Sequence, residues 1–492
     1  MKSLNDTLRE QFESVDDDVK RKYNPFNVRD FAENVKYGNH TEIIAGMNLV
    51  ADIQTGKMRE QSIYIKHSPL LDPVKYMMGK YDTKDAGFHK TPLDPTSNAK
   101  IKSTNNASFV DGMFSYLAST LDEKEFKHAV GYYGSFFAVQ EKFKMNITDD
   151  YEYLCESNYF NTHNGKGFAI GGVKPKLAKL GITDDDVQLE QDGGSLSDAA
   201  GLAQETSPDT PLEEVYVRDG DNSENGSGSE DGSEDGSESE DGSESESEDG
   251  SESESEDGSE SEPKFAYIDN FPVNMICLEK CDGSLDELLE RDEMDEHLGA
   301  SAMFQIVASL IVYQREFKLT HNDLHTNNIM YVNTDLEFLE YIFNNAHYKV
   351  PTYGKIFKII DFGRSIFTYK DKVWCSDSFA PGGDASTQYN CEPFLNNGKP
   401  RLDPNYSFDL CRLGCSIYDF IIHDEDEEDM DGFQKTVCRW CLDDKSKSVL
   451  YTKSGYERYP DFKLYKMVAR TVHSHTPLAQ LEYPFFSQFL QN

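Results

Sequence analysis

A long acidic segment divides this chain into two parts that can fold. Residues 219–262 contain 20 Asp or Glu and no Lys or Arg, and they belong to a low-complexity segment, 186–262, that repeats the units DGSE and SESE. Few apolar side chains are present there to offset the entropy of ordering the chain, and the like charges repel one another. We therefore expect 186–262 to be a disordered insertion, either a solvated spacer or a tract for regulatory phosphorylation.

Charge and hydropathy outside this insertion are typical of a folded protein. The net charge of the chain is −41, of which −20 falls within 219–262, so −21 remains for the other residues. Binding of duplex nucleic acid needs clustered Lys and Arg, so this balance argues against nucleic acid as a direct partner and permits basic proteins. No run of about 20 apolar residues is present, and the N-terminal segment is charged where a signal peptide is apolar. We expect a soluble, intracellular protein without a membrane partner.

The nine cysteines favour a reducing compartment, because their number is odd and they are scattered along the chain. Two close pairs, Cys411 with Cys415 and Cys438 with Cys441, admit a zinc site as an alternative. The first pair lies in an apolar helical stretch, and no histidine spacing completes a set of four ligands. Buried thiols are the favoured interpretation.

Apolar periodicity predicts strands mainly before the insertion and helices mainly after it. The turn QTGK joins the first two predicted strands as a hairpin, and apolar residues surround the last predicted helix, which must therefore be buried. In chain order, the predicted elements are strands at 43–53, 61–68 and 132–147, a helix at 106–121 between the last two of them, a strand at 274–280, and helices within 281–298 and 301–319.

Two polar motifs follow the predicted buried helix. THNDLHTNNIMYV starts at residue 320, and KIFKIIDFGRS contains an apolar strand that ends on Asp361. Phosphoryl transfer from ATP needs a carboxylate that orients the acceptor hydroxyl and takes its proton, oxygen ligands for Mg²⁺, and a lysine against the phosphates. Asp323 can be the base, while Asn328 and Asp361 can be the metal ligands. The five-residue step from Asp323 to Asn328 lets one loop supply both a base and a ligand.

These motifs resemble the signature of the protein kinase superfamily, in which a His-x-Asp-x-x-x-x-Asn loop is followed by Asp-Phe-Gly. SFDLCRLGCSIYDF keeps the family spacing between Asp409 and Gly414, and the resemblance implies that Asp409 opens a buried helix and supports the loop backbone. The phrases SPLLDPVKYMMGKYD, VPTYGKIFKIIDFGRSIF and CSDSFAPGGDASTQYNCEPF are most similar to serine/threonine-type kinases of large nucleocytoplasmic DNA viruses of the iridovirus and mimivirus kind. A viral protein of this kind would act in the host cytoplasm or the virion.

The resemblance also implies the fold and the domain organisation. We expect an α+β, two-lobed, protein-kinase-like fold with a small strand-rich N-lobe and a larger helical C-lobe, interrupted by the acidic insertion. The expected parts are an N-terminal extension at 1–40, the first part of the N-lobe at 41–185, the insertion at 186–262, the hinge strand and hinge at 263–281, and the C-lobe at 282–492.

The nucleotide site follows from the same resemblance. IYIK is similar to the strand that carries the ATP lysine, which makes Lys66 that residue. MICLEKCDGSLDELL is similar to the strand, hinge and helix that hold adenine, so Glu279 to Cys281 would form the hinge. The carboxylate partner expected for Lys66 is Asp111 or a residue that the sequence does not identify, and Asp111 can also be a plain surface carboxylate.

Several positions depart from the family pattern. No G-x-G-x-x-G precedes Lys66, so a glycine loop over the phosphates is not expected. Asn322 replaces the Arg that reads a phosphorylated segment, which predicts constitutive activity or control by a partner. His325 replaces the Lys of serine/threonine enzymes, and it either contacts the γ-phosphate or packs within the loop. Residues 333–354 predict an enlarged hairpin, and Glu392 is expected to pair with a later Arg.

The sequence thus predicts an ATP- and Mg²⁺-dependent protein kinase that phosphorylates Ser or Thr of protein substrates, possibly basic ones. Lys66, Asp323 and His325 would be catalytic. One alternative is a small-molecule or lipid kinase of the same fold, which His325 favours. The other is a pseudokinase scaffold for basic proteins, which the missing glycine loop favours. The acceptor protein, Ser/Thr against Tyr preference and oligomeric state remain open.

Overall fold

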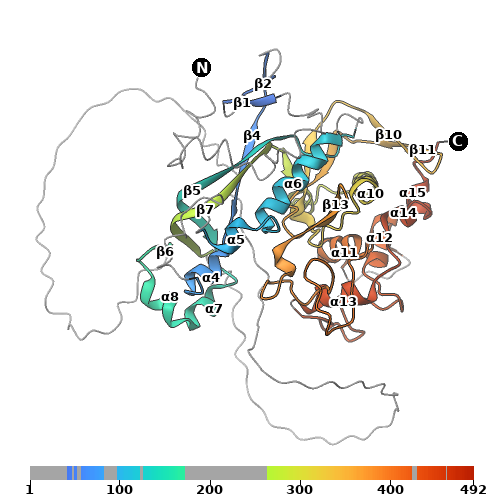
Figure 1. Ribbon diagram of the computed structural model, residues 1–492. Coiled ribbons are helices and arrows are strands. Elements are labelled where there is room, and N and C mark those ends of the chain that lie inside the picture. Colours follow the sequence, from blue (N-terminus) through green and yellow to red (C-terminus); the bar gives the residue numbers. More distant parts are fainter. Residues whose placement is uncertain are drawn as a thin grey trace, which may run out of the picture.

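The chain folds as a mixed α+β protein with several antiparallel sheets (Figure 1). The predicted N-terminal extension and acidic insertion lie outside the residues that the structure describes. This computed structural model describes residues 42–46, 49–52, 57–81, 97–121, 126–171, 263–423, 429–460 and 462–491.

The main sheet has the strand order β4, β7, β5, with β6 also pairing with β7. The central strand β7 is buried along most of its length, because the sheet is covered on both faces. In Figure 1 the helix α6 crosses in front of these strands, and its Asn106 cap accepts a hydrogen bond from Ser108 N. These elements are β4 (Ile63–Pro69), β5 (Tyr132–Asn146), β6 (Phe168–Gly171), β7 (Phe265–Glu279) and α6 (Ala107–Ser119).

The acidic insertion connects two neighbouring strands of this sheet. β6 and β7 run antiparallel, and Gly171, the last residue of β6, pairs with Phe265, the first residue of β7. The 93 residues from 172 to 264 therefore leave and re-enter the sheet at one point. The insertion therefore lies between two strands of one sheet and does not link two separate folded units.

The predicted N-terminal hairpin is partly wrong. β1 (Glu42–Gly46), β2 (Leu49–Asp52) and β3 (Met58–Glu60) form their own three-stranded sheet, so the turn joins β2 to β3. β4, the strand predicted as the hairpin partner, pairs with β7 instead. Burial decides this pairing, because β4 brings apolar residues to the main sheet while all three residues of β3 are exposed.

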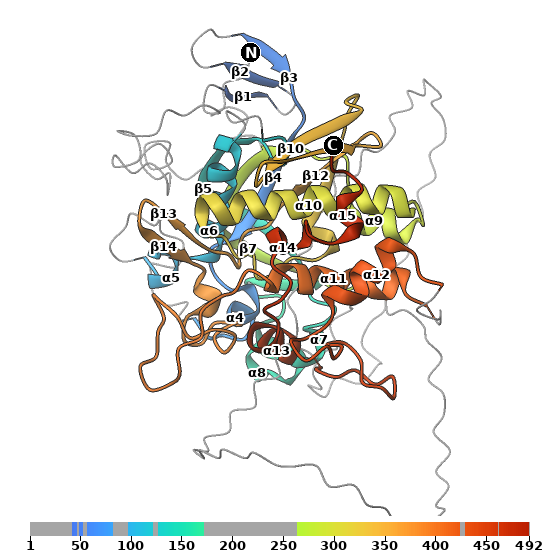
Figure 2. The ribbon, with the colours of Figure 1, turned by 90° about the vertical axis from the view of Figure 1, so that its right-hand side faces the viewer.

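Helices dominate the C-terminal half, and α10 (Glu296–Phe317) runs through its centre, as Figure 2 shows. Asp295 caps this helix by accepting a hydrogen bond from Leu298 N, and Lys318 ends it in the left-handed conformation. By length and composition α10 could cross a membrane, but 83% of its most apolar window is buried within the protein, so it is a core helix. Around it lie α9 (Leu285–Glu290), α11 (Phe408–Ile421), α12 (Gly432–Trp440), α13 (Lys463–Thr471), α14 (Pro477–Gln480) and α15 (Pro484–Ser487).

Short hairpins complete this half. The enlarged hairpin predicted over 333–354 is confirmed as β10 and β11, and the outer edge of β11 is covered by the C-terminal segment through a bridge from Tyr348 to Leu490. The remaining strands are β8 (Gly283–Ser284), β9 (Ile329–Asn333), β10 (Phe338–Phe343), β11 (Ala346–Pro351), β12 (Lys355–Ile359), β13 (Ile366–Tyr369) and β14 (Lys372–Cys375). The remaining α-helices are α4 (Pro73–Met77), α5 (Ala99–Lys102), α7 (Tyr151–Glu156) and α8 (Asn158–His163).

Three of the four cysteines in the two close pairs are buried thiols, while Cys438 is half-buried. Cys411, Cys415 and Cys441 belong to one apolar cluster. Within the described part of the chain, no group of three or more His, Cys, Asp or Glu side chains is arranged to hold a metal ion. The structure therefore favours the buried-thiol interpretation over the zinc alternative.

Candidate active site

Two polar loops lie side by side at the ends of β9 and β12. One follows α10 and leads into β9, and the other follows β12 and begins at Ile360. β9 and β12 pair antiparallel with Ile329 opposite Ile359, so the loop ends are neighbours. A hydrogen bond from Ile360 N to Asn328 O, 3.0 Å, joins them directly. The sheet register therefore places Asn328 next to Asp361, although the two are 33 positions apart in sequence.

Asp409 holds the backbone of the first loop in place. Its carboxylate accepts hydrogen bonds from His321 N at 2.9 Å and from Asn322 N at 2.8 Å. The carboxylate is fully buried at the start of α11, and burial raises its pKa against the opposing effects of His321 and the two amides. The predicted role of Asp409, to open a buried helix and support this backbone, is confirmed.

Asp323 is anchored by two side chains that the sequence did not identify. The Tyr465 hydroxyl of α13 donates to Asp323 Oδ1 at 2.8 Å, and Arg364 Nη1 lies 3.6 Å from the same oxygen. Burial alone would raise the pKa of Asp323, but the charges of Arg364 and Arg412, with the Tyr465 hydroxyl, outweigh it and lower the pKa. Asp323 is therefore an ionised carboxylate held in one orientation.

The third side chain of the first loop, Asn328, is also held in place. Its amide nitrogen donates to Asp323 O at 2.9 Å and lies 3.0 Å from His325 Nε2. Burial lowers the pKa of His325, which keeps the imidazole neutral and able to accept this hydrogen bond. Of the two roles predicted for His325, the structure supports packing and hydrogen bonding within the loop.

Lys66 joins three elements by ion pairs. Its ammonium lies 2.8 Å from Asp361 Oδ2 and 3.1 Å from Asp111 Oδ2 on α6. Asp111 also accepts a hydrogen bond from Phe362 N at 2.9 Å. The prediction that Asp111 is the partner of Lys66 is confirmed, and the alternative of a surface carboxylate is wrong, because the Asp111 side chain is only 3% exposed.

The two carboxylates beside Lys66 differ in their environment. Burial raises the pKa of Asp111, and the charge of Lys66 only partly offsets this. At Asp361 burial also raises the pKa, but the charge of Lys66 outweighs this effect and lowers the pKa to about 2. The Asp361 side chain is 41% exposed, so it is an ionised group that solvent can reach.

Asp361 and Asn328 fit a magnesium site. Mg²⁺ prefers oxygen ligands and is usually held by one or two carboxylates together with substrate phosphates and water. Asp361 offers an ionised, partly exposed carboxylate, and no described residue donates a hydrogen bond to the side-chain oxygen of Asn328. One or two protein oxygen ligands are usual for Mg²⁺, and phosphates and water supply the other ligands when the ion is bound.

The predicted hinge contains an ion pair that the sequence did not suggest. The Glu279 carboxylate accepts hydrogen bonds from Lys358 Nζ at 2.7 Å and Gly131 N at 3.0 Å, and Lys358 also donates to Ala129 O. The Glu279 carboxylate is therefore engaged in hydrogen bonds within the protein. The backbone of Cys281 remains available, since no described group bonds to its amide, while its buried thiol has a pKa raised to about 12.

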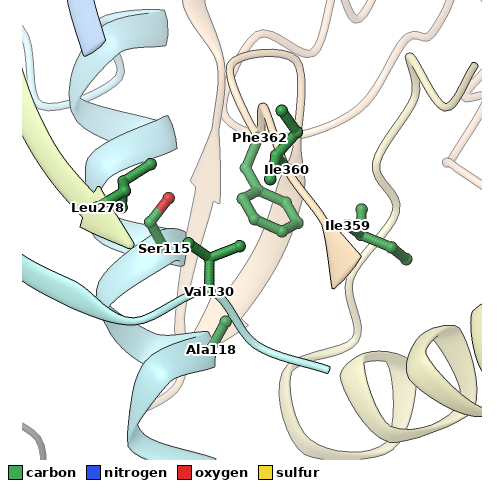
Figure 3. A pocket seen from close by; sticks show the side chains of 7 residues that line it. All are labelled: Ser115, Ala118, Val130, Leu278, Ile359, Ile360 and Phe362. Carbon is green, nitrogen blue, oxygen red and sulfur yellow. The ribbon is translucent and has the colours of Figure 1, made fainter. Parts of the chain in front are cut away.

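A small apolar cavity lies between α6, the end of β7 and the second polar loop, as Figure 3 shows. The Phe362 ring points into this space from the residue after Asp361. The cavity has a volume of about 10 Å³, which is at the lower limit for a single water molecule and far too small for a ligand. Its seven lining residues are Ser115, Ala118, Val130, Leu278, Ile359, Ile360 and Phe362.

Asn322 connects the first loop to the segment that follows Asp361. It has a positive φ of 65°, and its side chain donates to Arg364 O and accepts from the Tyr389 hydroxyl at 2.8 Å. Arg364 in turn donates to Asp384 at 2.7 Å. These contacts hold the segment against the loop without a phosphate group, which is consistent with the expectation that Asn322 does not read phosphorylation.

The prediction for Glu392 is wrong. Glu392 makes no ion pair within the described residues. Arg401, which lines a surface groove together with Glu392, instead binds Asp403 at 2.7 Å. Asp403 is two residues from Arg401, so it meets this exposed guanidinium without closing a longer loop.

A scan against protein-family models and a search of curated proteins both returned no match to the chain. Any functional assignment therefore depends on the motifs and on the geometry around Asp323, Asn328, Asp361 and Lys66.

Proposed function

We propose that this chain is an ATP-dependent protein kinase of the serine/threonine type. One observation carries the proposal: Asp323, Asn328, Asp361 and Lys66, four residues from three distant segments, meet at one edge of the main sheet. Phosphoryl transfer needs a base, oxygen ligands for metal and a lysine, and these are the groups that meet. The sequence resemblance to protein kinases supports the same reading.

Each residue has a distinct role in this proposal. Asp323 orients the acceptor hydroxyl and takes its proton, since its carboxylate is ionised and fixed by Tyr465. Lys66 binds the ATP phosphates, and Asp111 keeps its ammonium in position. Asn328 and Asp361 hold Mg²⁺, which neutralises phosphate charge when bound. His325 fixes the Asn328 amide.

The proposed fold is the two-lobed kinase fold with a strand-rich N-lobe and a helical C-lobe. The strand order β4, β7, β5 with α6 packed on it supports the N-lobe assignment, and the helices around α10 support the C-lobe. In this assignment the hinge runs from Glu279 to Cys281, whose amide would hydrogen-bond adenine. The Lys358 to Glu279 ion pair then ties β12 to the hinge.

Two other functions remain as rivals. A small-molecule or lipid kinase of the same fold would keep the site but change the acceptor. The hydrogen bond between His325 and Asn328 gives this histidine a role within the loop that does not depend on the acceptor. A pseudokinase scaffold for basic proteins would not require ionised Asp323 and Asp361, and the retention of both speaks against it.

An assay with the full-length protein tests the proposal. Purified protein is incubated with γ-labelled ATP and Mg²⁺, with a mixture of basic and acidic proteins, a lipid vesicle, or a panel of small hydroxyl compounds as acceptor. We expect label on Ser or Thr of protein, and no label after EDTA removes the metal. Label only on lipids or small compounds supports the first rival. No transfer to any acceptor, with Mg²⁺-dependent ATP binding retained, supports the scaffold.

The pH dependence of this activity follows from the two shifted groups. The lowered pKa of Asp323 keeps the proposed base ionised above its ordinary value of 3.8, and the lowered pKa of His325 keeps the imidazole neutral above 6.5. We therefore expect kcat/KM for the protein acceptor to be flat between about pH 6.5 and 8. A change in kcat/KM with a midpoint near pH 7 in the wild type, absent in His325→Gln, would contradict this assignment of protonation states.

A further inference from the structure

The helix α13 lies beside both parts of the site that a protein acceptor would meet. Tyr465 on α13 donates to Asp323, the proposed base. Five residues further along α13, Arg470 donates to Thr387 O at 3.0 Å and Gln388 O at 3.5 Å, in the segment that follows Asp361. α13 lies at the lower end of the C-terminal half in Figure 1, beneath α11. The face of α13 that carries Arg470 therefore borders the segment after Asp361, along which a protein acceptor would lie in the proposed kinase.

That side of α13 carries a stripe of positive charge. Lys463, Lys466 and Arg470 stand at spacings of three and four residues, which places them on one face of the helix. Lys463 and Arg470 are exposed and Lys466 is half-buried. None of the three pairs with a carboxylate of the described residues, whereas the cations inside the site, Lys66 and Arg364, are paired with Asp361 and Asp384.

We infer that this stripe, Lys463, Lys466 and Arg470, selects acidic acceptor segments, and that the first such segment is residues 219–262 of the chain itself. The inference rests on the proposed kinase function and names its substrate class. Unpaired cations beside the acceptor site favour carboxylates next to the reacting hydroxyl and disfavour Lys or Arg there. The acidity of the whole chain favours basic partners, but the local charge at α13 has the opposite sign.

Residues 219–262 match this surface in charge and in acceptor groups. They contain 14 serines, 13 of which are followed directly by Glu, and no basic residue. Phosphorylation of each serine would add a charge of about −2, so every product would be a better ligand for the stripe than its precursor. Repeated transfer along the SESE units is therefore expected.

The chain length allows the segment to reach its own site. Its ends are held together where Gly171 pairs with Phe265, and 93 residues lie between them. At about 3.3 Å per residue, the middle of such a segment can extend roughly 150 Å from its anchor. A folded unit of about 400 residues has a radius of gyration of roughly 21 Å, so every point of its surface is within reach.

The test uses the full chain and a pair of synthetic peptides. Phosphorylated residues of the protein are mapped by mass spectrometry after incubation with Mg²⁺ and ATP. Transfer is then measured to an acidic peptide with the sequence of 243–249 and to the same peptide with every Asp and Glu replaced by Lys. We expect autophosphorylation within 219–262, and kcat/KM about tenfold or more higher for the acidic peptide.

Charge reversal identifies the surface. Lys463→Glu with Lys466→Glu should lower kcat/KM for the acidic peptide about tenfold through KM, leave the KM for ATP unchanged, and narrow or invert the preference between the peptides. Lys435→Glu with Lys453→Glu is the matched control, because both lysines are exposed and neither pairs with a described carboxylate. The control pair should keep the acidic preference. Salt near 0.5 M should reduce that preference in the wild type, because ions screen exposed charges.

The results separate this inference from the function on which it rests. A preference for the Lys peptide, or an acidic preference that survives reversal at α13, overturns the inference and leaves the kinase function standing. Absence of transfer to both peptides, to the chain itself and to the mixed proteins overturns the kinase function. Transfer confined to 219–262 and the acidic peptide, and lost on charge reversal, supports both.

Discussion

Replacing Asp323 with Asn should lower phosphate transfer by about 10³-fold while the fold is retained. General base catalysis contributes about 10²–10⁴-fold to a rate, and an amide cannot accept the proton of the acceptor hydroxyl. The structure makes Asn a close substitute in shape, because the Tyr465 hydroxyl can still donate to Oδ1. Transfer is measured by labelled ATP at saturating acceptor, and the fold by thermal unfolding.

Asp384→Asn is the matched control for this variant. Asp384 binds the guanidinium of Arg364 through Nη2 at 2.7 Å. Asp384→Asn therefore removes a comparable negative charge beside the same arginine. We expect it to change transfer less than about tenfold, because it does not touch the acceptor. Equal losses in both variants would mean that Asp323 acts through Arg364, and substantial residual transfer in Asp323→Asn would refute its role as the base.

Replacing Lys66 with Met should be the most destabilising single change in the site. The ammonium neutralises Asp111, whose side chain is 3% exposed, and Asp361. Removing one partner of a buried ion pair leaves an uncompensated charge, which costs about 3 kcal/mol of unfolding free energy. Transfer should also fall by about 10²–10³-fold, since a group that stabilises the phosphates is lost. Denaturant unfolding measures the first effect and the labelled-ATP assay the second.

A second substitution separates stability from activity. Asp111→Asn in the Lys66→Met background removes the unpaired buried carboxylate, so the double variant should recover about 2 kcal/mol but no activity. Lys142→Met is the control on the same sheet, because it breaks an exposed ion pair with Asp269 and should change stability by less than about 1 kcal/mol. If Lys66→Met unfolds with wild-type stability, the buried pair does not contribute as described.

The stability difference between wild type and Lys66→Met should depend on pH. Lys66 lowers the pKa of Asp361 from 3.8 to about 2 in the folded protein. A lowered pKa contributes stability that is fully present above the unfolded value and is lost as pH falls through the folded value. The contribution of this carboxylate should therefore be complete above about pH 4 and absent near pH 2. A difference that grows as pH falls would contradict the pairing.

The motif residues could be predicted because their spacing is local. Asp323 and Asn328 share one loop, and Asp361 ends an apolar strand, so the sequence alone indicates oxygen ligands and a base. The helices α6, α10 and α11 and the β10 to β11 hairpin also follow from short-range periodicity and turn residues. Local patterns of this kind specify an element without its neighbours.

Pairing between distant segments could not be predicted from local sequence patterns. The hairpin predicted for β4 was wrong because a turn signal describes only nearby strands, whereas β4 pairs with a strand some 200 residues later. Asp111 remained one option among several because its ion pair with Lys66 forms between a strand and a helix. No local signal could have indicated that Tyr465, 142 residues after Asp323, would donate to it.

By itself the sequence determined the chemical groups, the helices and strands that carry them, and the acidic tract with its serines. Only the tertiary structure decided which charges are neutralised and which remain unpaired. Lys66 and Arg364 are cancelled by carboxylates from other segments, while Lys463 and Lys466 meet no described carboxylate. Charges act over a few ångströms and are screened beyond about 10 Å, so their effect depends on folded distances that a linear sequence does not contain.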